Sequence, residues 1–374
     1  MSDLLPGRPR VAVFLATSGH SGVDRIAQRL IPAMASRGTA VDLLRVQGHG
    51  PVLDPVPDGV RVIDLGSRHV YGCLLPLARY LRRERPHALL ADKDRVNRTA
   101  LLARWLAGVP LRLVLRSGTT ISVDLASRGV VDRWLQRNSM RFLYRHADAV
   151  VVPSRGAAND LATFAALPLD HIRVVANPVV TPDLAEWAAK PPPHPWFDEQ
   201  VPVVLGVGEL SERKDFATLV RAFARLRRDR RCRLVILGDG RRRDELLGLA
   251  GRLGISDDFA LPGFVPNPYA AMARAAAFAL TSRWEGLGIV LVEALALGTP
   301  SVACDCPSGP REVLADGAYG PLVPVGDDAA LASALARLLD DPPARELVQL
   351  AARPYHVDES ARAYLEVLGL EAGA

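Results

Sequence analysis

Two acidic residues stand eight positions apart in a mostly apolar segment, residues 281–300. Glu285 precedes the turn Gly286–Gly288, and Glu293 is the one charge in the run Ile289–Leu297. A buried carboxylate is costly unless hydrogen-bond donors surround it. Glycines in a turn that opens a helix let a ligand approach the backbone, and the free amides of the first helical turn favour a phosphate. The segment therefore indicates a site for a phosphate-bearing ligand.

The spacing of the two glutamates suggests how they would share such a ligand. Eight helical residues rise about 12 Å along the axis. The two side chains would then point to nearly the same side of the helix. One acid would reach the sugar end of a nucleotide-sugar, and the other would bind its ribose hydroxyls. The residues also leave open a buried helix in which Glu293 is bonded to backbone amides.

A second segment, Gly206–Phe216, carries adjacent cations between an expected strand and an expected helix. Arg213 and Lys214 would stand at the start of a helix, where the helix dipole repels positive charge. A bound anion such as a diphosphate would offset this repulsion. Gly208 belongs to a G-x-G pair that is a weak signal alone. Solvated surface charge is the alternative interpretation of the two cations.

The elements that would position these residues alternate between short apolar runs and amphipathic stretches of helical length. This order predicts an α/β fold with parallel, doubly wound sheets. The proline-rich segment 190–196 cannot continue a helix and is interpreted as an inter-domain linker. The strands expected before this linker are 11–16, 40–46, 88–91, 111–115, 149–152 and 172–175, and those after it are 203–207, 233–237, 276–280 and 301–303.

Taken together, several segments of the second half resemble glycosyltransferase family 4. They are Gly206–Phe216, Leu237–Gly240, Pro262–Val265, Glu285–Glu293 and Cys306–Glu312, and the resemblance covers nearly all of residues 200–330. The E-x7-E motif is the most specific part. The first half is similar more weakly, at Ser21–Arg25 and Asn177–Pro178.

The resemblance implies a GT-B fold, in which two Rossmann-like domains face each other across a cleft. We expect an acceptor-binding domain at residues 1–185, a nucleotide-sugar-binding domain at 200–355, and a helix within 356–374 that packs back on the first domain. The resemblance also implies a retaining transfer of a hexose or N-acetylhexosamine from a nucleotide-diphosphate sugar to a glycan or lipid-linked glycan. The preferred donor would be a UDP-sugar. Neither a metal ion nor a cofactor is implied.

Site residues follow from the positions that match the family motifs. Glu285 would orient the donor sugar, Lys214 would stabilise the departing diphosphate, and Arg213 would assist it. Glu293 would hold the ribose. The remaining donor contacts are expected from Gly22, Gly208, Gly263, Phe264, Val265, Gly286, Leu287 and Gly288.

Two positions depart from the family pattern. The family usually has Arg where this chain has Glu209, so that Arg213 would have to replace that cation. The family also commonly has His where Gly118 stands. These departures keep open an inactive scaffold partner of a glycosyltransferase, beside a nucleotide-sugar epimerase on the same GT-B scaffold. A dehydrogenase is disfavoured because the dinucleotide fingerprint is missing.

The charge of the chain is unevenly distributed. Residues 1–180 carry 25 Lys and Arg against 14 Asp and Glu, a net charge of +11, whereas the whole chain has +5. Arg133, Arg137, Arg141 and Arg145 recur every four residues and would form one row on a helix. The row indicates a surface for an anionic membrane or a lipid-linked acceptor, with a solvated face opposite a core face as the alternative.

Composition restricts the remaining classes of protein. Aromatic residues make up only 6%, and no stacking platform or helix-turn-helix pattern suggests nucleic acid. The four cysteines fit buried, reduced thiols and no metal site. Because we find neither a signal peptide nor a membrane-spanning run, we expect a cytoplasmic protein that is peripheral at the inner face of the cytoplasmic membrane.

Overall fold

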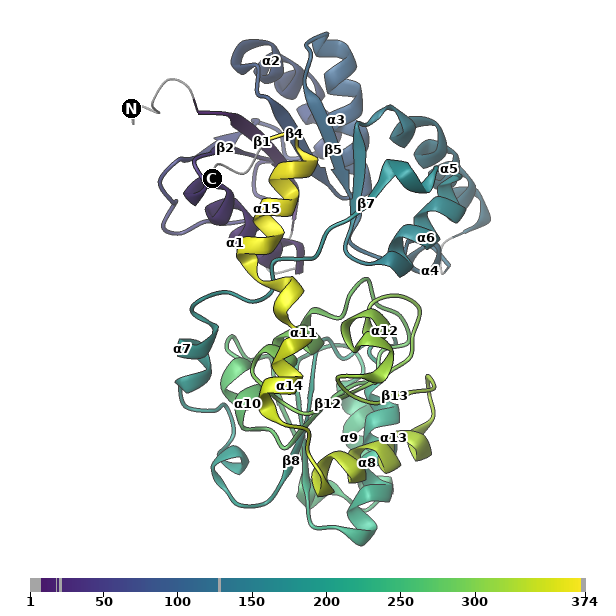
Figure 1. The fold of residues 1–374 in the computed structure, drawn as a ribbon. Helices are drawn as coiled ribbons and strands as arrows, with labels where there is room; N and C mark the ends of the chain where they lie inside the picture. The colour runs from purple at the N-terminus through teal and green to yellow at the C-terminus, as the bar shows by residue number, and fades with distance from the viewer. Residues whose placement is uncertain (1–7, 18, 20–21, 127–128, 371–374) are drawn as a thin grey trace. The chain divides into compact units, whose positions relative to one another are not determined.

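The structure is a computed structural model that describes residues 8–17, 19, 22–126 and 129–370. The chain forms two compact units, shown in Figure 1. Unit 1 comprises residues up to Pro178 together with the segment from His356 onward, and unit 2 runs from Val179 to Tyr355. The C-terminal segment therefore belongs to the same unit as the N-terminal residues.

A parallel sheet forms the centre of unit 1, and its described residues give seven strands in the order β3-β2-β1-β4-β5-β6-β7. Because the order reverses beside β1, this is a doubly wound sheet. The strands are β1 (Arg10–Leu15), β2 (Ala40–Arg45), β3 (Val60–Asp64), β4 (Ala88–Asp92), β5 (Arg112–Arg116), β6 (Ala149–Val152) and β7 (Ile172–Val174).

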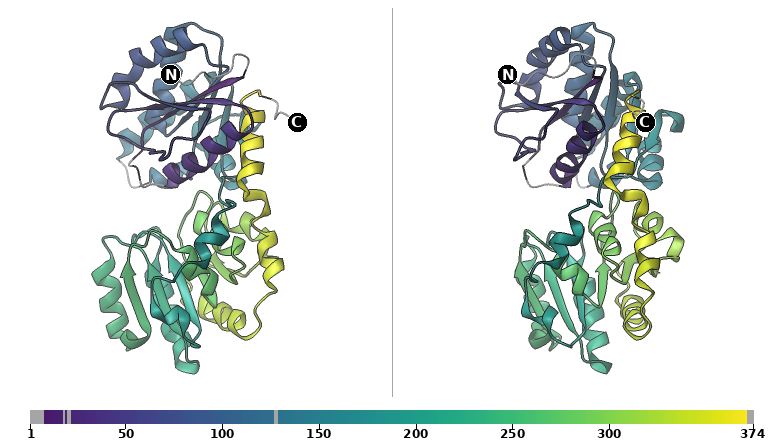
Figure 2. Two further views of the ribbon diagram at one scale, coloured as in Figure 1. Left: turned by 90° about the vertical axis from the view of Figure 1, so that its left-hand side faces the viewer. Right: turned by 60° about the vertical axis from the view of Figure 1, so that its left-hand side comes forward.

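Helices cover both faces of this sheet, which explains why its strands are apolar on both sides. In β1, Val11 and Val13 pack with α1 and α15, whereas Ala12 and Phe14 belong to the core on the opposite face. Figure 2 shows α15 beside α1. The helices are α1 (Gly22–Ser36), α2 (Leu74–Glu84), α3 (Asp94–Ala107), α4 (Ile121–Asp124), α5 (Val130–Leu143), α6 (Arg155–Ala165) and α15 (Val357–Val367).

Unit 2 is built around a second parallel sheet, whose six strands have the order β10-β9-β8-β11-β12-β13. The strands are β8 (Val203–Val207), β9 (Arg233–Leu237), β10 (Phe259–Gly263), β11 (Ala277–Leu280), β12 (Ser301–Cys304) and β13 (Leu322–Val323). The helices are α7 (Leu184–Ala189), α8 (Phe216–Asp229), α9 (Arg243–Arg252), α10 (Tyr269–Arg274), α11 (Ile289–Ala296), α12 (Pro310–Val313), α13 (Asp328–Asp340) and α14 (Arg345–Leu350).

The proline-rich segment 190–196 lies within unit 2, so its interpretation as a linker is wrong. The chain passes from one unit to the other at Pro178, and α7, which precedes the prolines, packs on α10. Prolines stop a helix, but they also occur in loops that pack on their own domain. The strand expectations miss β3, β10 and β13, which are edge strands of the two sheets and have mixed burial.

Within the described residues, no helix is both long and apolar enough to cross a membrane.

Candidate active site

The site in unit 2 lies where the strand order of its sheet reverses. β8 has β9 on one side and β11 on the other, so the loops that follow β8 and β11 leave the sheet next to each other. Open α/β sheets bind ligands outside the carboxyl ends of their strands at such a switch point. Lys214 lies in the first of these loops and Glu285 in the second.

Three side chains converge on the Glu285 carboxylate. Lys214 Nζ donates to Oε1 over 2.6 Å, and Ser282 Oγ donates to the same oxygen over 2.7 Å. Arg213 Nη1 donates to Oε2 over 3.3 Å. Lys214 and Glu285 are buried, whereas Arg213 is half-buried. The structure thus brings together the three residues that the sequence predicts for catalysis.

The electrostatics of this group keep Glu285 charged. Burial by itself would raise the pKa of Glu285. The charges of Lys214 and Arg213, with hydrogen bonds from Lys214 and Ser282, outweigh burial and lower that pKa below its ordinary value. An ammonium has three donors, so Lys214 can hold Glu285 and still donate to a phosphate oxygen.

Backbone contacts fix the two loops against each other. Thr281 Oγ1 donates to the Lys214 carbonyl over 2.8 Å, and the Arg283 amide donates to the Arg213 carbonyl over 2.8 Å. The Arg283 guanidinium also donates to the buried Asp215 carboxylate over 3.2 Å. These loop–loop contacts fix the positions of Lys214 and Glu285, as a preorganised site requires.

Glycines allow the loop after β8 to lie close to its neighbours. A Cβ on Gly208 would lie 3.0 Å from Lys214 Cε, and a Cβ on Gly238 would lie 1.8 Å from the Gly208 carbonyl oxygen. Gly238 also has a φ of +152°, which side chains rarely adopt. The motif Leu237–Gly240 thus packs backbone against backbone beneath Lys214.

Glu293 lies on α11, is fully buried, and accepts a hydrogen bond from the Tyr269 hydroxyl at 3.0 Å. Glu285 lies in the loop before α11, because Gly288 is the N-cap in a left-handed conformation with φ +86°. The expectation that the two glutamates lie eight helical residues apart is therefore wrong. A glycine in a left-handed conformation at 288 ends the loop and lets the helix begin only there.

The other donor residues are placed in turns of unit 2. Leu287 is buried beside Gly286 and Gly288 at the start of α11. Gly263 ends β10 with a φ of +99°, and Phe264 after it is 68% exposed. Their contacts with a nucleotide stay predictions. Gly22 is the first residue of α1 in unit 1, and most of the loop before it, residues 18 and 20–21, is outside the described residues.

The two departures from the family pattern have different surroundings. Glu209 is exposed in the loop after β8. In unit 1, a Cβ on Gly118 would lie 3.1 Å from Arg116 Nη1, so the Arg116 guanidinium fills the space beside this position. That guanidinium is buried and bonded to Asp92, Asn177 and Tyr364. A network of four buried side chains therefore lies beside Gly118.

The helix α5, which carries the arginine row, has mostly exposed side chains. Met140 is the buried residue of α5, while Trp134 is 62% and Phe142 is 55% exposed. The alternative, a solvated face opposite a core face, would place Trp134, Leu135, Phe142 and Leu143 against the core. Leu143 does pack against the core beside Met140, whereas the other three side chains are exposed. The exposed members of this surface, called the α5 face below, are Val130, Val131, Arg133, Trp134, Leu135, Arg137, Arg141 and Phe142.

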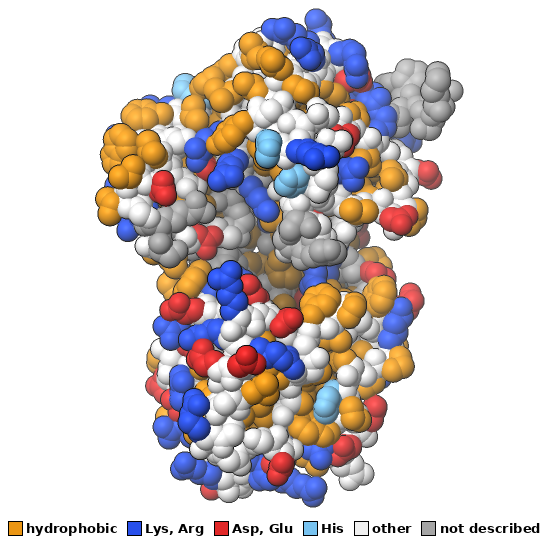
Figure 3. Space-filling model, turned by 180° about the vertical axis from the view of Figure 1, so that it is seen from behind, with side chains coloured by type: hydrophobic (Ala, Val, Ile, Leu, Met, Phe, Trp, Pro, Cys, Tyr) orange, Lys and Arg blue, Asp and Glu red, His pale blue; other side chains and the backbone are white. Residues whose placement is uncertain are grey.

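Arginine and aromatic side chains lie close together on the α5 face. The Arg141 guanidinium lies 5.8 Å from the centre of the Phe142 ring, and Arg145 lies 5.7 Å from it. Arg145 itself is in the short 3₁₀ turn Tyr144–His146 that follows α5. Figure 3 shows hydrophobic side chains gathered among Lys and Arg side chains on the surface of unit 1.

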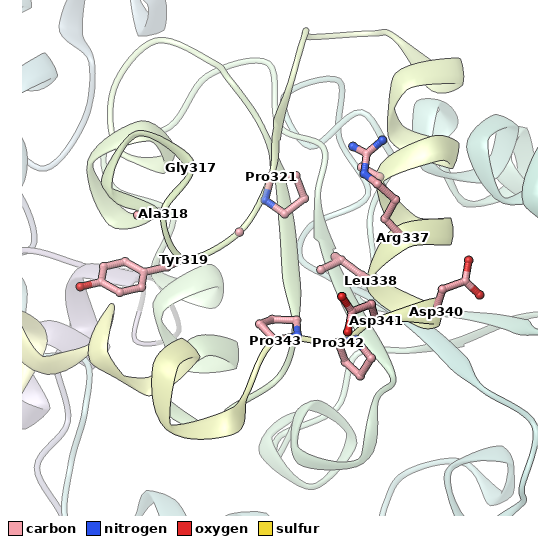
Figure 4. A pocket seen from close by; sticks show the side chains of 12 residues that line it. Gly317, Ala318, Tyr319, Pro321, Arg337, Leu338, Asp340, Asp341, Pro342 and Pro343 are labelled. Atoms are coloured by element: carbon pink, nitrogen blue, oxygen red, sulfur yellow. The ribbon is translucent and has the colours of Figure 1, made fainter.

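A cavity of about 590 Å³ also opens in unit 2, between the residues before β13 and the end of α13 (Figure 4). Its wall includes Tyr319, Pro321, Arg337 and Asp341, and none of the predicted site residues lines it. The cavity is therefore separate from the group around Glu285. Among the described residues, no three His, Cys, Asp or Glu side chains come together as a metal site, and metal-independent activity stays a prediction.

Comparison with known proteins decides the family. The family model described as glycosyl transferases group 1 matches residues 193–353, and the one described as a glycosyl transferase 4-like domain matches residues 21–178. The alpha-D-kanosaminyltransferase of Streptomyces kanamyceticus is 30% identical over 289 residues, which is 73% of each chain. The chain belongs to glycosyltransferase family 4.

Another relative of this glycosyltransferase acts on a lipid-linked glycan, according to its name. The N-acetylgalactosamine-N,N'-diacetylbacillosaminyl-diphospho-undecaprenol 4-alpha-N-acetylgalactosaminyltransferase of Campylobacter jejuni is 33% identical over 248 residues, 66% of each chain. Among solved structures, HepE of Anabaena in complex with UDP has a TM-score of 0.75 and 20% identity, and the match covers 96% of this chain and 99% of HepE. The expected GT-B fold is confirmed.

Several residues of the candidate site could not be found from the sequence. Ser282, Tyr269, Thr281 and Arg283 make contacts that depend on how loops from different strands meet. Ser282 gives a weak signal, since it stands three residues before Glu285. Tyr269 gives none, because it approaches Glu293 from another helix.

Proposed function

We propose that this glycosyltransferase retains anomeric configuration and moves a hexose or N-acetylhexosamine from a nucleotide-diphosphate sugar, a UDP-sugar by preference, to a glycan or lipid-linked glycan. The observation that carries the proposal is the Glu285 carboxylate at the switch point of unit 2, held by Lys214 and Ser282. The names of the Campylobacter relative and of the HepE complexes with UDP and UDP-glucose support this choice of acceptor and donor.

Each residue has a distinct part in the proposed reaction. The bond between the sugar C1 and the diphosphate oxygen breaks, and C1 becomes bonded to an acceptor oxygen on the same face of the ring. The acceptor hydroxyl gives its proton to the departing diphosphate oxygen. Negative charge develops on the departing diphosphate, where Lys214 donates and Arg213 assists. Glu285 orients the sugar, Glu293 holds the ribose, and backbone groups of Gly263–Val265 frame the base.

We also propose that the α5 face binds an anionic membrane surface, where a lipid-linked acceptor would be found. Exposed Trp134 and Phe142 beside Arg137 and Arg141 form the combination of apolar and basic side chains that interfacial helices use. The protein would then act at the inner face of the cytoplasmic membrane.

A screen of nucleotide-sugars by thermal shift tests the donor. A ligand at a hundred times its Kd stabilises the native state by about 2.7 kcal/mol, so that the matching nucleotide-sugar raises the melting temperature measurably. UDP-sugars, GDP-sugars and ADP-sugars should be compared with the free sugars. If none of the nucleotide-sugars shifts the transition, the proposed donor site is wrong.

Turnover with and without a lipid-linked acceptor then separates the three candidate functions. A transferase releases UDP mainly when the acceptor is present, whereas an epimerase releases an altered sugar without any acceptor. A scaffold partner binds the nucleotide-sugar weakly or not at all and does neither. Activity should persist in chelator, and its loss with recovery on adding magnesium or manganese would contradict the metal-independent reaction.

A further inference from the structure

Tyr269 connects two parts of unit 2 that the proposed function assigns to one nucleotide. Its hydroxyl donates to Glu293 Oε1 at 3.0 Å, and Glu293 is fully buried on α11. Tyr269 is the first residue of α10, which packs on α11. Three residues separate Tyr269 from Gly263–Val265, the segment expected to frame the base.

The position of Tyr269 is fixed by contacts on its own backbone. The Asn267 Oδ1 atom accepts from the Tyr269 amide at 3.1 Å, and the Asn267 Nδ2 atom donates to the Trp187 carbonyl at 2.9 Å. At the other end of α10, Arg274 Nη1 donates to the Ala188 carbonyl at 3.0 Å. Because α7 holds α10 at both ends, the hydroxyl of Tyr269 is presented to Glu293 from a rigid helix.

A glutamate carboxylate needs such support to bind a diol with precision. Rotation about the terminal bond of a glutamate side chain is only weakly restricted, so that a carboxylate can present its oxygens in many directions. A hydrogen bond to one oxygen fixes the carboxylate plane. The phenol is suited to this task, because a neutral hydroxyl donates without adding charge next to the diphosphate.

We propose that Tyr269 is a positioning residue, which holds the Glu293 carboxylate in the orientation that binds the ribose hydroxyls of the nucleoside diphosphate. The inference rests on the proposed function of Glu293. It extends that function to a residue that does not itself touch the ribose. Tyr269 also relates the base-framing segment to the ribose contact, because it begins the helix that follows this segment and bonds to Glu293 on α11.

Calorimetric titration of the full chain with two nucleotides tests this role. The variant is Tyr269→Phe, which removes the hydroxyl and keeps the ring. Its affinity for UDP should fall about tenfold, the scale of a hydrogen bond to a charged group. Its affinity for 2′,3′-dideoxyuridine diphosphate should equal that of the wild type, because this nucleotide lacks the hydroxyls that Glu293 binds. Tyr319→Phe, in the cavity wall elsewhere in unit 2, is the matched control and should bind both nucleotides as the wild type does.

Two results would overturn the proposal. One is an equal loss of affinity for UDP and for the dideoxy nucleotide, which is also what a general folding defect would produce. The other is unchanged affinity for UDP. A failure of the proposed function looks different, since the wild type would then bind neither UDP nor GDP. If the wild type binds GDP instead, the same comparison is made with 2′,3′-dideoxyguanosine diphosphate.

Discussion

Lys214 Nζ lies 2.6 Å from Glu285 Oε1, although the two residues are 71 positions apart in the chain. The pair joins the loop after β8 to the loop after β11, at the point where the strand order of unit 2 reverses. Both side chains are at least nine-tenths buried, and the carboxylate has Ser282 and Arg213 as further donors. A buried ion pair adds little stability by itself, but it fixes the geometry of two charged groups that a reaction can use.

The first prediction concerns the stability of the protein in acid. The pKa of Glu285 is lowered in the folded state, so its charge stabilises the fold above the ordinary glutamate value near 4.5, and this stability is lost as the pH falls through the lower folded value. Glu285→Gln should therefore cost stability at pH 7, by about 1–3 kcal/mol, and the difference from the wild type should shrink below about pH 4.5. Urea unfolding between pH 7 and pH 3 measures it, with Glu209→Gln as an exposed control. A difference that does not change with pH would contradict the charged Glu285.

The second prediction separates the two cations beside Glu285. Lys214→Ala should lower turnover about 100-fold or more, because it removes a buried donor to the departing diphosphate. Arg213→Ala should lower turnover less, about tenfold, because this side chain is half-exposed and more screened. Steady-state rates of UDP release measure both. A rate for Arg213→Ala equal to the wild type would show that Arg213 does not replace the family arginine at position 209.

The third prediction concerns the thiols. All four cysteines are free and buried. Burial raises the pKa of Cys306 to about 12, with a further contribution from the Glu285 charge, and it raises the pKa of Cys304 and of Cys232 to about 11. Because the thiolate is the reactive form, the native protein should react very slowly with a disulfide reagent at pH 8, and all four thiols should react in denaturant. Rapid labelling of one thiol in the native state would contradict this burial.

The fourth prediction concerns the membrane. Each basic residue near an anionic surface contributes about 1 kcal/mol, and salt screens this attraction. The wild type should therefore sediment with anionic vesicles at low ionic strength and much less at moderate ionic strength. Arg133→Glu with Arg141→Glu should release the protein without changing UDP binding in unit 2. Because Trp134 is exposed, Trp134→Ala should also weaken vesicle binding.

Matched variants keep the membrane prediction testable. Arg228→Glu with Arg231→Glu, in unit 2, reverses the same number of charges outside the α5 face and should leave vesicle binding close to that of the wild type. Equal binding of the wild type to anionic and neutral vesicles, or none to either at low salt, would leave the α5 face as a solvated surface.

The comparison between sequence and structure shows which inferences local patterns support. Strands such as β8 and β9 are mostly buried apolar runs that are each followed by a glycine, and their bounds are predicted correctly. The convergence of Lys214 and Glu285 follows from motif and strand order together. The exposure of Trp134 and Phe142 could not be predicted, because periodicity shows which residues share a face and not whether another element covers that face.

The remaining site contacts depend on tertiary geometry. Tyr269 reaches Glu293 because α10 packs on α11, and nothing in the spacing of 24 positions encodes this approach. Gly118 is close to Arg116 because a buried network with Asp92 and Asn177 holds the guanidinium there. A motif predicts a residue's chemistry, but the neighbours that orient it come from other parts of the chain.

Calorimetric titration of UDP into the wild type, Glu293→Ala and Glu285→Gln tests the central claim most directly. We expect Glu293→Ala to bind UDP at least about tenfold more weakly, because a buried contact to the ribose hydroxyls is lost. Glu285→Gln should bind UDP within about threefold of the wild type, since its proposed contact is with the sugar that UDP lacks. A folded Glu293→Ala variant with wild-type affinity, or a wild type that binds no nucleoside diphosphate, would contradict the assignment of this site to a nucleotide-sugar.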